Sequence, residues 1–266
     1  MTAQEANSST FRLDGKVAVV TGGGSGIGQA IALKFAVQGS SIRILDVNEA
    51  GAAATCQRIA DAGGTASAHL CDVTNQADVI ARFNDLFRSE RIHILVNNAG
   101  VSHIGTVEST APEDFDRVVR VNIKGFYNCM RAVIGHMKTS GGGVILNMAS
   151  IAGSAGLADR FAYSMSKGAV IAMTYSVARD YLVHKIRCNC ISPARVHTPF
   201  VDDYLQKTYP GREQEMFEKL AKAQPIGRMA EPAEVASLAL FLCSDEAAFI
   251  TGVDYPLDGG FFNLRG

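Results

Sequence analysis

The chain has 266 residues, of which 47% are hydrophobic and 19% charged, so it holds enough apolar surface for a sizeable core. Its formal net charge is −1 and it has no basic block, which argues against nucleic acid or a membrane surface as a partner. No segment approaches the roughly 20 unbroken apolar residues of a membrane-spanning helix. The first ten residues lack the basic start and apolar run of a signal peptide, so we expect a cytoplasmic protein.

The six cysteines lie singly inside apolar runs. Cys188 and Cys190 form a C-x-C pair in a predicted strand, where alternate side chains face opposite ways, so they suit neither a disulfide framework nor a metal cluster. We therefore expect buried thiols and no metal site. The polar residues 1–12 are predicted to be a flexible leader, and residues 13–266 to form a single domain.

Strand-like and helix-like segments alternate from residue 16 onward. Short β-rich apolar runs predict strands at residues 16–21, 42–46, 65–71, 92–96, 144–148, 186–191 and 253–257. Helices are predicted at residues 26–38 and 49–62, from near residue 75, from residue 112, at 161–183 and from residue 232. Thr110 is predicted to cap the helix that begins with Pro112. This alternation favours an α/β fold of the Rossmann type, a doubly wound parallel sheet with helices on both faces.

Residues 193–225 interrupt the alternation. The segment is polar and rich in proline, and it contains two short helical patterns. Long excursions of this kind inside a compact domain are usually functional, so we predict a substrate lid here.

A glycine-rich stretch, T-G-G-G-S-G-I-G from Thr21 to Gly28, lies between the first strand and the first helix. Glycine lets the backbone turn sharply and approach a pyrophosphate, and the helix N-terminus supplies amide donors and a positive dipole end. A glycine cluster can also be a flexible turn, but its place in a strand–turn–helix unit favours a dinucleotide site. The residues predicted to contact the dinucleotide here are Gly22, Ser25, Gly26, Ile27 and Gly28.

The second predicted strand ends in Asp46, 18 residues past Gly28. A carboxylate there accepts hydrogen bonds from the adenosine ribose hydroxyls and repels a 2′-phosphate. Arg43 is nearby but should point elsewhere. Asp46 could instead only cap the following helix. We predict NAD rather than NADP as the cofactor.

Tyr163 and Lys167 stand four residues apart in a predicted helix, so their side chains are adjacent on one face. A tyrosine normally loses its proton near pH ~10, and the neighbouring lysine ammonium together with a positively charged nicotinamide is expected to lower the pKa of Tyr163. Ser150 lies at the end of the fifth predicted strand, where its hydroxyl can bind a reacting substrate oxygen or merely cap a turn. Asn122 is expected in mid-helix, as a structural bridge or as part of a proton relay.

With these four residues and the sequence Asn97-Asn98-Ala99-Gly100, the chain resembles the short-chain dehydrogenase/reductase family from about Leu13 to its C-terminus. The resemblance implies an NAD-dependent oxidoreductase acting on a CH–OH group. It implies that Tyr163 is the acid/base, Ser150 holds the reacting oxygen, and Lys167 binds the nicotinamide ribose and lowers the tyrosine pKa. It also implies that Asn122 anchors a water leading from Lys167 to solvent. Further cofactor contacts implied by the resemblance are Asp72, Val73, Asn98, Ala99, Gly100, Val196 and Thr198.

One departure from the family pattern follows the sixth strand, where the usual Pro-Gly is replaced by Pro193-Ala194. Alanine is tolerable there if its backbone avoids positive φ. The charged residues Arg160, Arg195 and His103 are predicted to face the substrate. An arginine in a closed pocket suits a carboxylate, although any of these groups could be a solvated loop charge.

The stretch from Ser192 to Asp202 and that from Tyr209 to Glu213 are similar to bacterial dehydrogenases of 2-keto-3-deoxy-L-fuconate and L-rhamnonate. The similarity implies oxidation of carbon 4 of a 2-keto-3-deoxy acid sugar. Alternatives are a 3-oxoacyl carrier-protein reductase or another alcohol/ketone reductase, and a non-catalytic NAD-binding subunit. The family is typically tetrameric, and the apolar run 170–177 and the tail 258–262 are compatible with a homotetramer.

Overall fold

The structure, a computed structural model, describes residues 10–264. One parallel sheet forms its centre, with the strand order β3-β2-β1-β4-β5-β6-β7. The strands are β1 (Val17–Thr21), β2 (Ser41–Asp46), β3 (Ala66–Leu70), β4 (Ile94–Asn97), β5 (Gly143–Met148), β6 (Ile186–Pro193) and β7 (Asp254–Leu257). All the predicted strands are present within a few residues of their expected ends.

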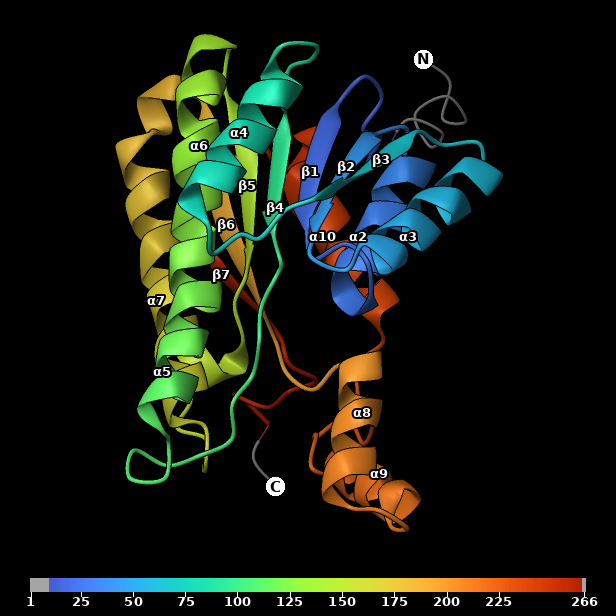
Figure 1. The fold of residues 1–266 in the computed structure, drawn as a ribbon, viewed down its shortest axis with the longest axis vertical. Coiled ribbons are helices and arrows are strands. Elements are labelled where there is room, and N and C mark those ends of the chain that lie inside the picture. The colour runs from blue at the N-terminus through green and yellow to red at the C-terminus, as the bar shows by residue number, and fades with distance from the viewer. Residues whose placement is uncertain (1–9, 265–266) are drawn as a thin grey trace.

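Helices cover both faces of this sheet (Figure 1). They are α2 (Gly26–Val37), α3 (Glu49–Asp61), α4 (Gln76–Phe87), α5 (Pro112–Val118), α6 (Gly125–Thr139), α7 (Phe161–Asp180) and α10 (Pro232–Cys243). A π-helical segment, η1 (Val119–Lys124), joins α5 to α6, and short 3-10 turns occur at η2 (Ile151–Gly153), η3 (Leu182–His184) and η4 (Asp245–Ala247). The predicted Rossmann-type fold is confirmed.

Two predicted helix ends are wrong. The N-cap of α5 is Ala111, while the Thr110 hydroxyl donates a hydrogen bond back to the Thr106 carbonyl at 2.7 Å. The hydroxyl is therefore used inside its own turn and caps no helix. Helix α7 stops at Asp180, before a turn in which Lys185 has a φ of 57°.

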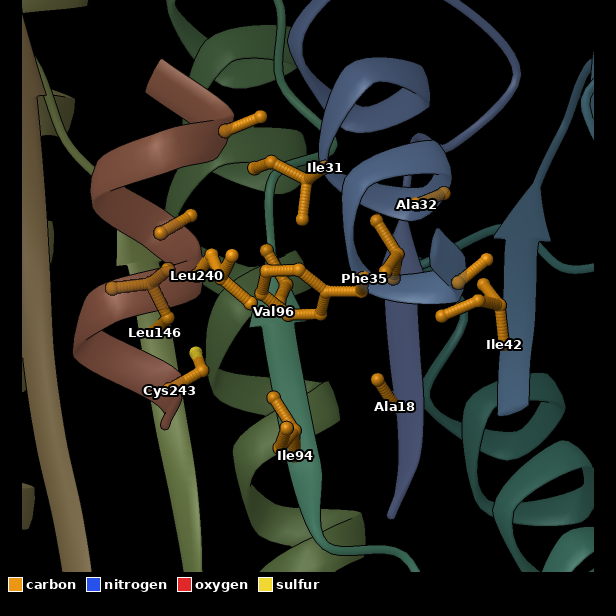
Figure 2. Packing of buried hydrophobic residues seen from close by; sticks show 14 of the residues in the cluster. Ala18, Ile31, Ala32, Phe35, Ile42, Ile94, Val96, Leu146, Leu240 and Cys243 are labelled. Carbon is orange, nitrogen blue, oxygen red and sulfur yellow. The ribbon is translucent and has the colours of Figure 1, made fainter. Parts of the chain in front are cut away.

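A separate apolar core lies on each face of the sheet. On one face, Phe35 of α2 and Leu240 of α10 pack over Val96 of β4 and its neighbours (Figure 2). On the other face, α4, α6 and α7 cover the sheet, with Phe83 and Phe126 fully buried. Because strands with both faces covered must be apolar throughout, β1 and β4 read as unbroken buried runs.

The predicted lid contains α8 (Pro199–Thr208) and α9 (Glu213–Lys222), which extend beyond the carboxyl edge of the sheet (Figure 1). The two ends of the lid are tied together at a neck, where Val196 pairs with Ala230 and the Arg195 carbonyl accepts from the Ala230 amide at 2.9 Å. The neck fixes where the lid leaves and re-enters the sheet.

Residues 1–9 of the predicted leader lie outside the described residues, while the Phe11 ring packs edge-on against Phe241, 5.8 Å between centroids. All six thiols are free; five are buried and Cys56 is half-buried. No helix among residues 10–264 has the length and apolar character needed to span a membrane.

Candidate active site

The glycine loop lies at the point where the strand order reverses, between β1 and β4. In open parallel sheets the crevice at such a point is where ligands bind, outside the carboxyl ends of the strands. Gly22 follows β1 with a φ of 66°, and a Cβ added to it would stand 2.9 Å from the Ala99 Cα beyond β4. The loops after β1 and β4 therefore meet at the switch point.

Gly28 is the most restricted glycine of the loop. A Cβ added there would lie 2.1 Å from the Gly22 carbonyl oxygen and 2.5 Å from the side-chain Nδ2 of Asn98. Asn98 holds this geometry by donating to the carbonyls of Thr21 and Gly22, both at 3.1 Å. The Thr21 hydroxyl in turn accepts from the Asn98 and Ala99 amides, at 3.0 and 3.1 Å. The loop is thus a built cradle whose space a side chain would fill.

Asp46 closes the loop from the end of β2. Its Oδ2 accepts a hydrogen bond from the Gly24 amide at 2.8 Å, and its Oδ1 accepts one from the Asn48 amide at 2.9 Å. The N-cap of α3 is Asn48 rather than Asp46. Arg43 points away from the loop, as expected, because it forms a two-point ion pair with Glu90. Asp46 is therefore positioned against the glycine loop and does not itself cap α3.

The segment after β3 is joined to the end of β2, where the Cys71 amide donates to the Asp46 carbonyl at 3.1 Å. The carboxylate of Asp72 accepts from the Thr74 amide at 2.9 Å, which shapes the turn. Val73 is buried, and its carbonyl accepts from the side chain of Asn128 in α6 at 2.8 Å. The backbone path of this turn is consequently fixed by α6.

Ser150 and Tyr163 form the centre of the second half of the site. Ser150 is buried at the end of β5, and its Oγ accepts from the Ala152 amide at 3.2 Å and lies 3.5 Å from the Pro193 carbonyl. Burial raises the pKa of Tyr163, against the opposing effects of a hydrogen bond with Ser150 and the positive charge of Arg160. Burial therefore outweighs these two effects, and the lowering of the tyrosine pKa by the Lys167 ammonium and a positively charged nicotinamide stays a prediction.

Lys167 lies one helical turn after Tyr163 and is 4% exposed. Its Nζ donates to the Met148 carbonyl at 2.7 Å and stands 5.7 Å from the centre of the Tyr163 ring. Burial lowers the lysine pKa to about 8. The structure thus brings Ser150, Tyr163 and Lys167 to one end of β5, as the predicted i, i+4 spacing on α7 requires.

Asn122 lies in the π-helical segment rather than in a regular helix. Its Oδ1 accepts from the Val101 amide at 2.8 Å, and its Nδ2 donates to the Val101 carbonyl at 2.8 Å and the Ser166 hydroxyl at 3.0 Å. A Cβ on Gly100 would lie 3.3 Å from that Oδ1 and 3.7 Å from the lysine Nζ. The asparagine side chain therefore ties the loop after β4 to α7 next to Lys167.

Two arginines face the mouth of the site from different elements. Arg160 precedes α7 and donates to the Ser102 hydroxyl at 3.3 Å, and Arg195 lies at the lid neck. Burial and a hydrogen bond with Tyr209 raise the pKa of Tyr204 in α8, against the positive charges of Arg160 and Arg195. Within residues 10–264, neither arginine has a carboxylate within ion-pair distance. Sequence reasoning missed Tyr204, since nothing in a polar lid helix distinguishes a tyrosine that turns inward.

The remaining predicted residues separate into two groups. Thr198 is the N-cap of α8, and its side chain lies 3.4 Å from where a Gly26 Cβ would be, so it adjoins the glycine loop. Val196 is buried in the neck of the lid. His103 makes its described contacts within its own loop and with α5, where its Nδ1 is 3.7 Å from Asp114. No contact in the described structure joins His103 to the groups around Tyr163.

The crevice, the carboxylate-closed glycine cradle and the buried lysine beside a tyrosine define a nicotinamide-dependent oxidoreductase that acts on alcohol or ketone groups. The chain belongs to the short-chain dehydrogenase/reductase family. Residues 22–262 match the family model described as enoyl-(acyl carrier protein) reductase.

Relatives of established name cover nearly the whole chain. D-threitol dehydrogenase of Mycolicibacterium smegmatis is 39% identical, over 94% of this chain and 94% of its own. Ligand-free aldohexose dehydrogenase of Thermoplasma acidophilum is 34% identical with a TM-score of 0.86, over 97% of both chains. A 7α-hydroxysteroid dehydrogenase in complex with NADH and 7-oxo glycochenodeoxycholic acid is 33% identical with a TM-score of 0.87, over 96% of this chain and 97% of its own. The substrates in these names range from a polyol to a steroid.

Proposed function

We propose that this protein uses NAD to oxidise the carbon-4 hydroxyl of a 2-keto-3-deoxy acid sugar of the L-fuconate or L-rhamnonate type. The observation that supports an acidic substrate is the pair Arg160 and Arg195, two neighbouring cations that lack a carboxylate among the described residues and of which Arg160 also acts on Tyr163. A substrate carboxylate fits such a pair through charge-assisted hydrogen bonds. The uncharged threitol named for one relative would leave both guanidinium groups without an anion.

The cofactor would lie along the crevice, with its pyrophosphate on the glycine loop and the start of α2. Ser25, Gly26 and Ile27 form the first turn there, and the turn at Asp72 and Val73 would border the adenine. Asp46 already accepts the Gly24 amide, and the remaining capacity of its two oxygens suits ribose hydroxyls better than a phosphate. These contacts favour NAD over NADP.

The nicotinamide end would lie under the lid neck, near Val196 and Thr198, with Ala99 and Gly100 opposite. When bound, the oxidised nicotinamide supplies the acceptor for the hydride that leaves the substrate carbon. Lys167, beside Gly100, would hydrogen-bond the adjoining ribose.

Tyr163 would remove the proton from the substrate hydroxyl, and the Ser150 hydroxyl would hold that oxygen by a hydrogen bond. The phenolate is favoured by positive charge close to it, from Arg160, from Lys167 and from an oxidised nicotinamide. The pKa of Lys167 is lowered to about 8, so its ammonium group can release a proton at a pH close to neutral. Asn122 holds the loop and helix around this lysine and would anchor the water that passes its proton to solvent.

The test is NADH formation from NAD or NADP across a panel of deoxy sugar acids, hydroxy acids and uncharged polyols. NAD-linked turnover of 2-keto-3-deoxy-L-fuconate or its rhamnonate relative is the expected result. Turnover of D-threitol alone would overturn the acidic substrate and leave the oxidoreductase class intact. A second assay follows NADPH oxidation on addition of a 3-oxoacyl thioester, and turnover there would identify the alternative carrier-protein reductase.

The catalytic tyrosine is tested by Tyr163→Phe, which removes the acid/base group and keeps the ring. The expected loss in kcat is about 10²- to 10⁴-fold, with NADH binding unchanged. Tyr181→Phe, at the C-terminal end of the same helix, is the matched control. Equal turnover by the two variants would refute the role of Tyr163 and would favour a binding protein without chemistry.

We also propose a cytoplasmic homotetramer. The exposed Tyr127 of α6 and Tyr175 of α7 lie on neighbouring helices that cover one face of the sheet, and such aromatic residues suit a subunit interface. Sedimentation equilibrium should give four times the chain mass, and a monomer at micromolar concentration would contradict the proposal.

A further inference from the structure

A cavity of about 290 Å³ lies between the base of the lid and the end of β7. Its lining includes Arg195 and its neighbour Ala194, Gln224 and Ile226 from the end of the lid, and Leu257 of β7. The Pro193 carbonyl next to Ala194 is the group that lies 3.5 Å from the Ser150 Oγ. The cavity therefore begins one residue from a contact of the candidate catalytic centre.

Most charged groups of this cavity already have protein partners. Arg228 makes a two-point ion pair with Glu234, at 2.7 and 2.8 Å. The Asp258 carboxylate accepts from the Gly260 and Phe262 amides, both at 2.9 Å. These three charged side chains are therefore paired within the protein, and their structural contacts explain their presence in the cavity wall.

Gln224 is different. It is 5% exposed although both residues before it and both after it, Lys222, Ala223, Pro225 and Ile226, are exposed. Its backbone is bonded locally to Ala221 and Gly227, but its side-chain Oε1 has no hydrogen-bond partner in the described structure. A buried acceptor without a partner costs free energy, so a residue of this kind needs a reason beyond folding.

We propose that Gln224 is a specificity-determining residue which accepts a hydrogen bond from a substrate hydroxyl in this cavity. The inference rests on the proposed function, because it assigns the cavity to the end of the sugar acid beyond the reacting carbon. Arg195 lines this cavity and lies close enough to Arg160 for their charges to interact, so an acid held by the two arginines can extend its other end toward Gln224. Ile226 and Leu257 supply apolar walls, which suit the methyl end of a deoxy sugar.

The size of the cavity agrees with this assignment. Small-molecule pockets usually measure roughly 300–1,000 Å³, so a volume of about 290 Å³ suits a short chain rather than an acyl or steroid group. Specificity from such a contact is large when an analogue lacks the hydroxyl, because the buried acceptor is then left unpaired. Gln224 accordingly selects hydroxylated substrates over their deoxy counterparts.

The experiment compares Gln224→Met with the wild type on two substrates that differ by one hydroxyl, 2-keto-3-deoxy-L-fuconate and 4-hydroxy-2-oxohexanoate. Methionine keeps the length of glutamine and removes the acceptor. The expected kcat/KM for the hydroxylated acid falls about 10- to 100-fold, and that for the deoxy acid changes less than about threefold. Gln214→Met, an exposed lid residue on α9, is the matched control.

Equal losses on both substrates, or no loss on either, overturn the inference. The melting temperature supplies an independent readout: Gln224→Met is expected to leave it unchanged or to raise it, since no described protein contact of Oε1 is lost. A decrease of more than about 4 °C would show that the side chain is structural and would also overturn the inference. If the wild type oxidises only D-threitol, the proposed acidic substrate fails, and the same ratio is measured for D-threitol against butane-1,2,4-triol, which lacks one of its hydroxyls.

Discussion

Asp46→Asn is the change that tests the cofactor preference most directly. The aspartate uses one oxygen for the Gly24 amide at 2.8 Å and the other for the Asn48 amide at 2.9 Å. Asparagine has a single acceptor oxygen, so in either orientation its NH₂ group opposes one of these backbone donors. The adenosine ribose hydroxyls would also lose their charged acceptor, and a hydrogen bond to a charged group contributes about 1.5–3 kcal/mol. At 1.4 kcal/mol for each factor of ten, we expect kcat/KM for NAD to fall about 10- to 100-fold.

The same change removes the negative charge that would repel a 2′-phosphate, so kcat/KM for NADP should fall less or rise. The assay is initial-rate NADH or NADPH formation with each cofactor, accompanied by thermal unfolding. Asp61→Asn at the exposed end of α3 is the matched control, since its carboxylate is bonded only to Gln57 across one helical turn. A ratio of NAD to NADP efficiency equal to that of the wild type would refute the reasoning from Asp46.

Three further outcomes are expected. Gly28→Ala should abolish NADH binding, measured by cofactor fluorescence, because its Cβ would meet the Gly22 carbonyl at 2.1 Å, whereas Gly135→Ala has open space and should bind normally. Arg160→Gln should raise the pKa of Tyr163 and shift the acid limb of the kcat/KM profile to higher pH, because the positive charge of Arg160 lowers that pKa in the wild type. An acid limb at the wild-type pH would contradict this. Burial lowers the pKa values of His93 and His136, so the unfolded chain binds more protons below pH ~6.5. The stability they contribute is fully present above that pH and decreases as the pH falls toward the lowered values, so replacing both residues by Gln should flatten the decline in denaturant midpoint between pH ~6.5 and ~5.

Local pattern was sufficient for most of the fold. The apolar runs of β1 and β4 are buried on both faces, and helices lie where the periodicity changes, because burial in a parallel sheet acts on each short segment in the same way. The spacing of Tyr163 and Lys167 placed both side chains beside the end of β5, since four residues make about one helical turn. The position of Asp46 beside the glycine loop could be predicted because the carboxyl ends of parallel strands lie at one edge of the sheet.

The features that sequence could not predict depend on groups far apart in the chain. The Thr110 hydroxyl donates to the Thr106 carbonyl instead of accepting from an amide at the start of α5, and composition does not decide between these two local hydrogen bonds. The tyrosine pKa is raised because several elements together desolvate Tyr163. The inward turn of Gln224 likewise depends on how the lid returns to the sheet, which no local pattern in the lid reveals.

The π-helical segment from Val119 to Lys124 has a consequence for how this chain can vary in length. A π turn holds one residue more than an α turn, and each residue of a regular helix turns the chain by about 100°. Removing a single residue here would therefore let α5 run into α6 as one regular helix, with the side chains on both sides keeping their directions. Asn122 lies inside the six residues whose path would change, so its bridge between Val101 and Ser166 would be lost while Phe126 stays in the core. A loss of one residue in this segment should therefore leave the fold intact and disrupt the surroundings of Lys167.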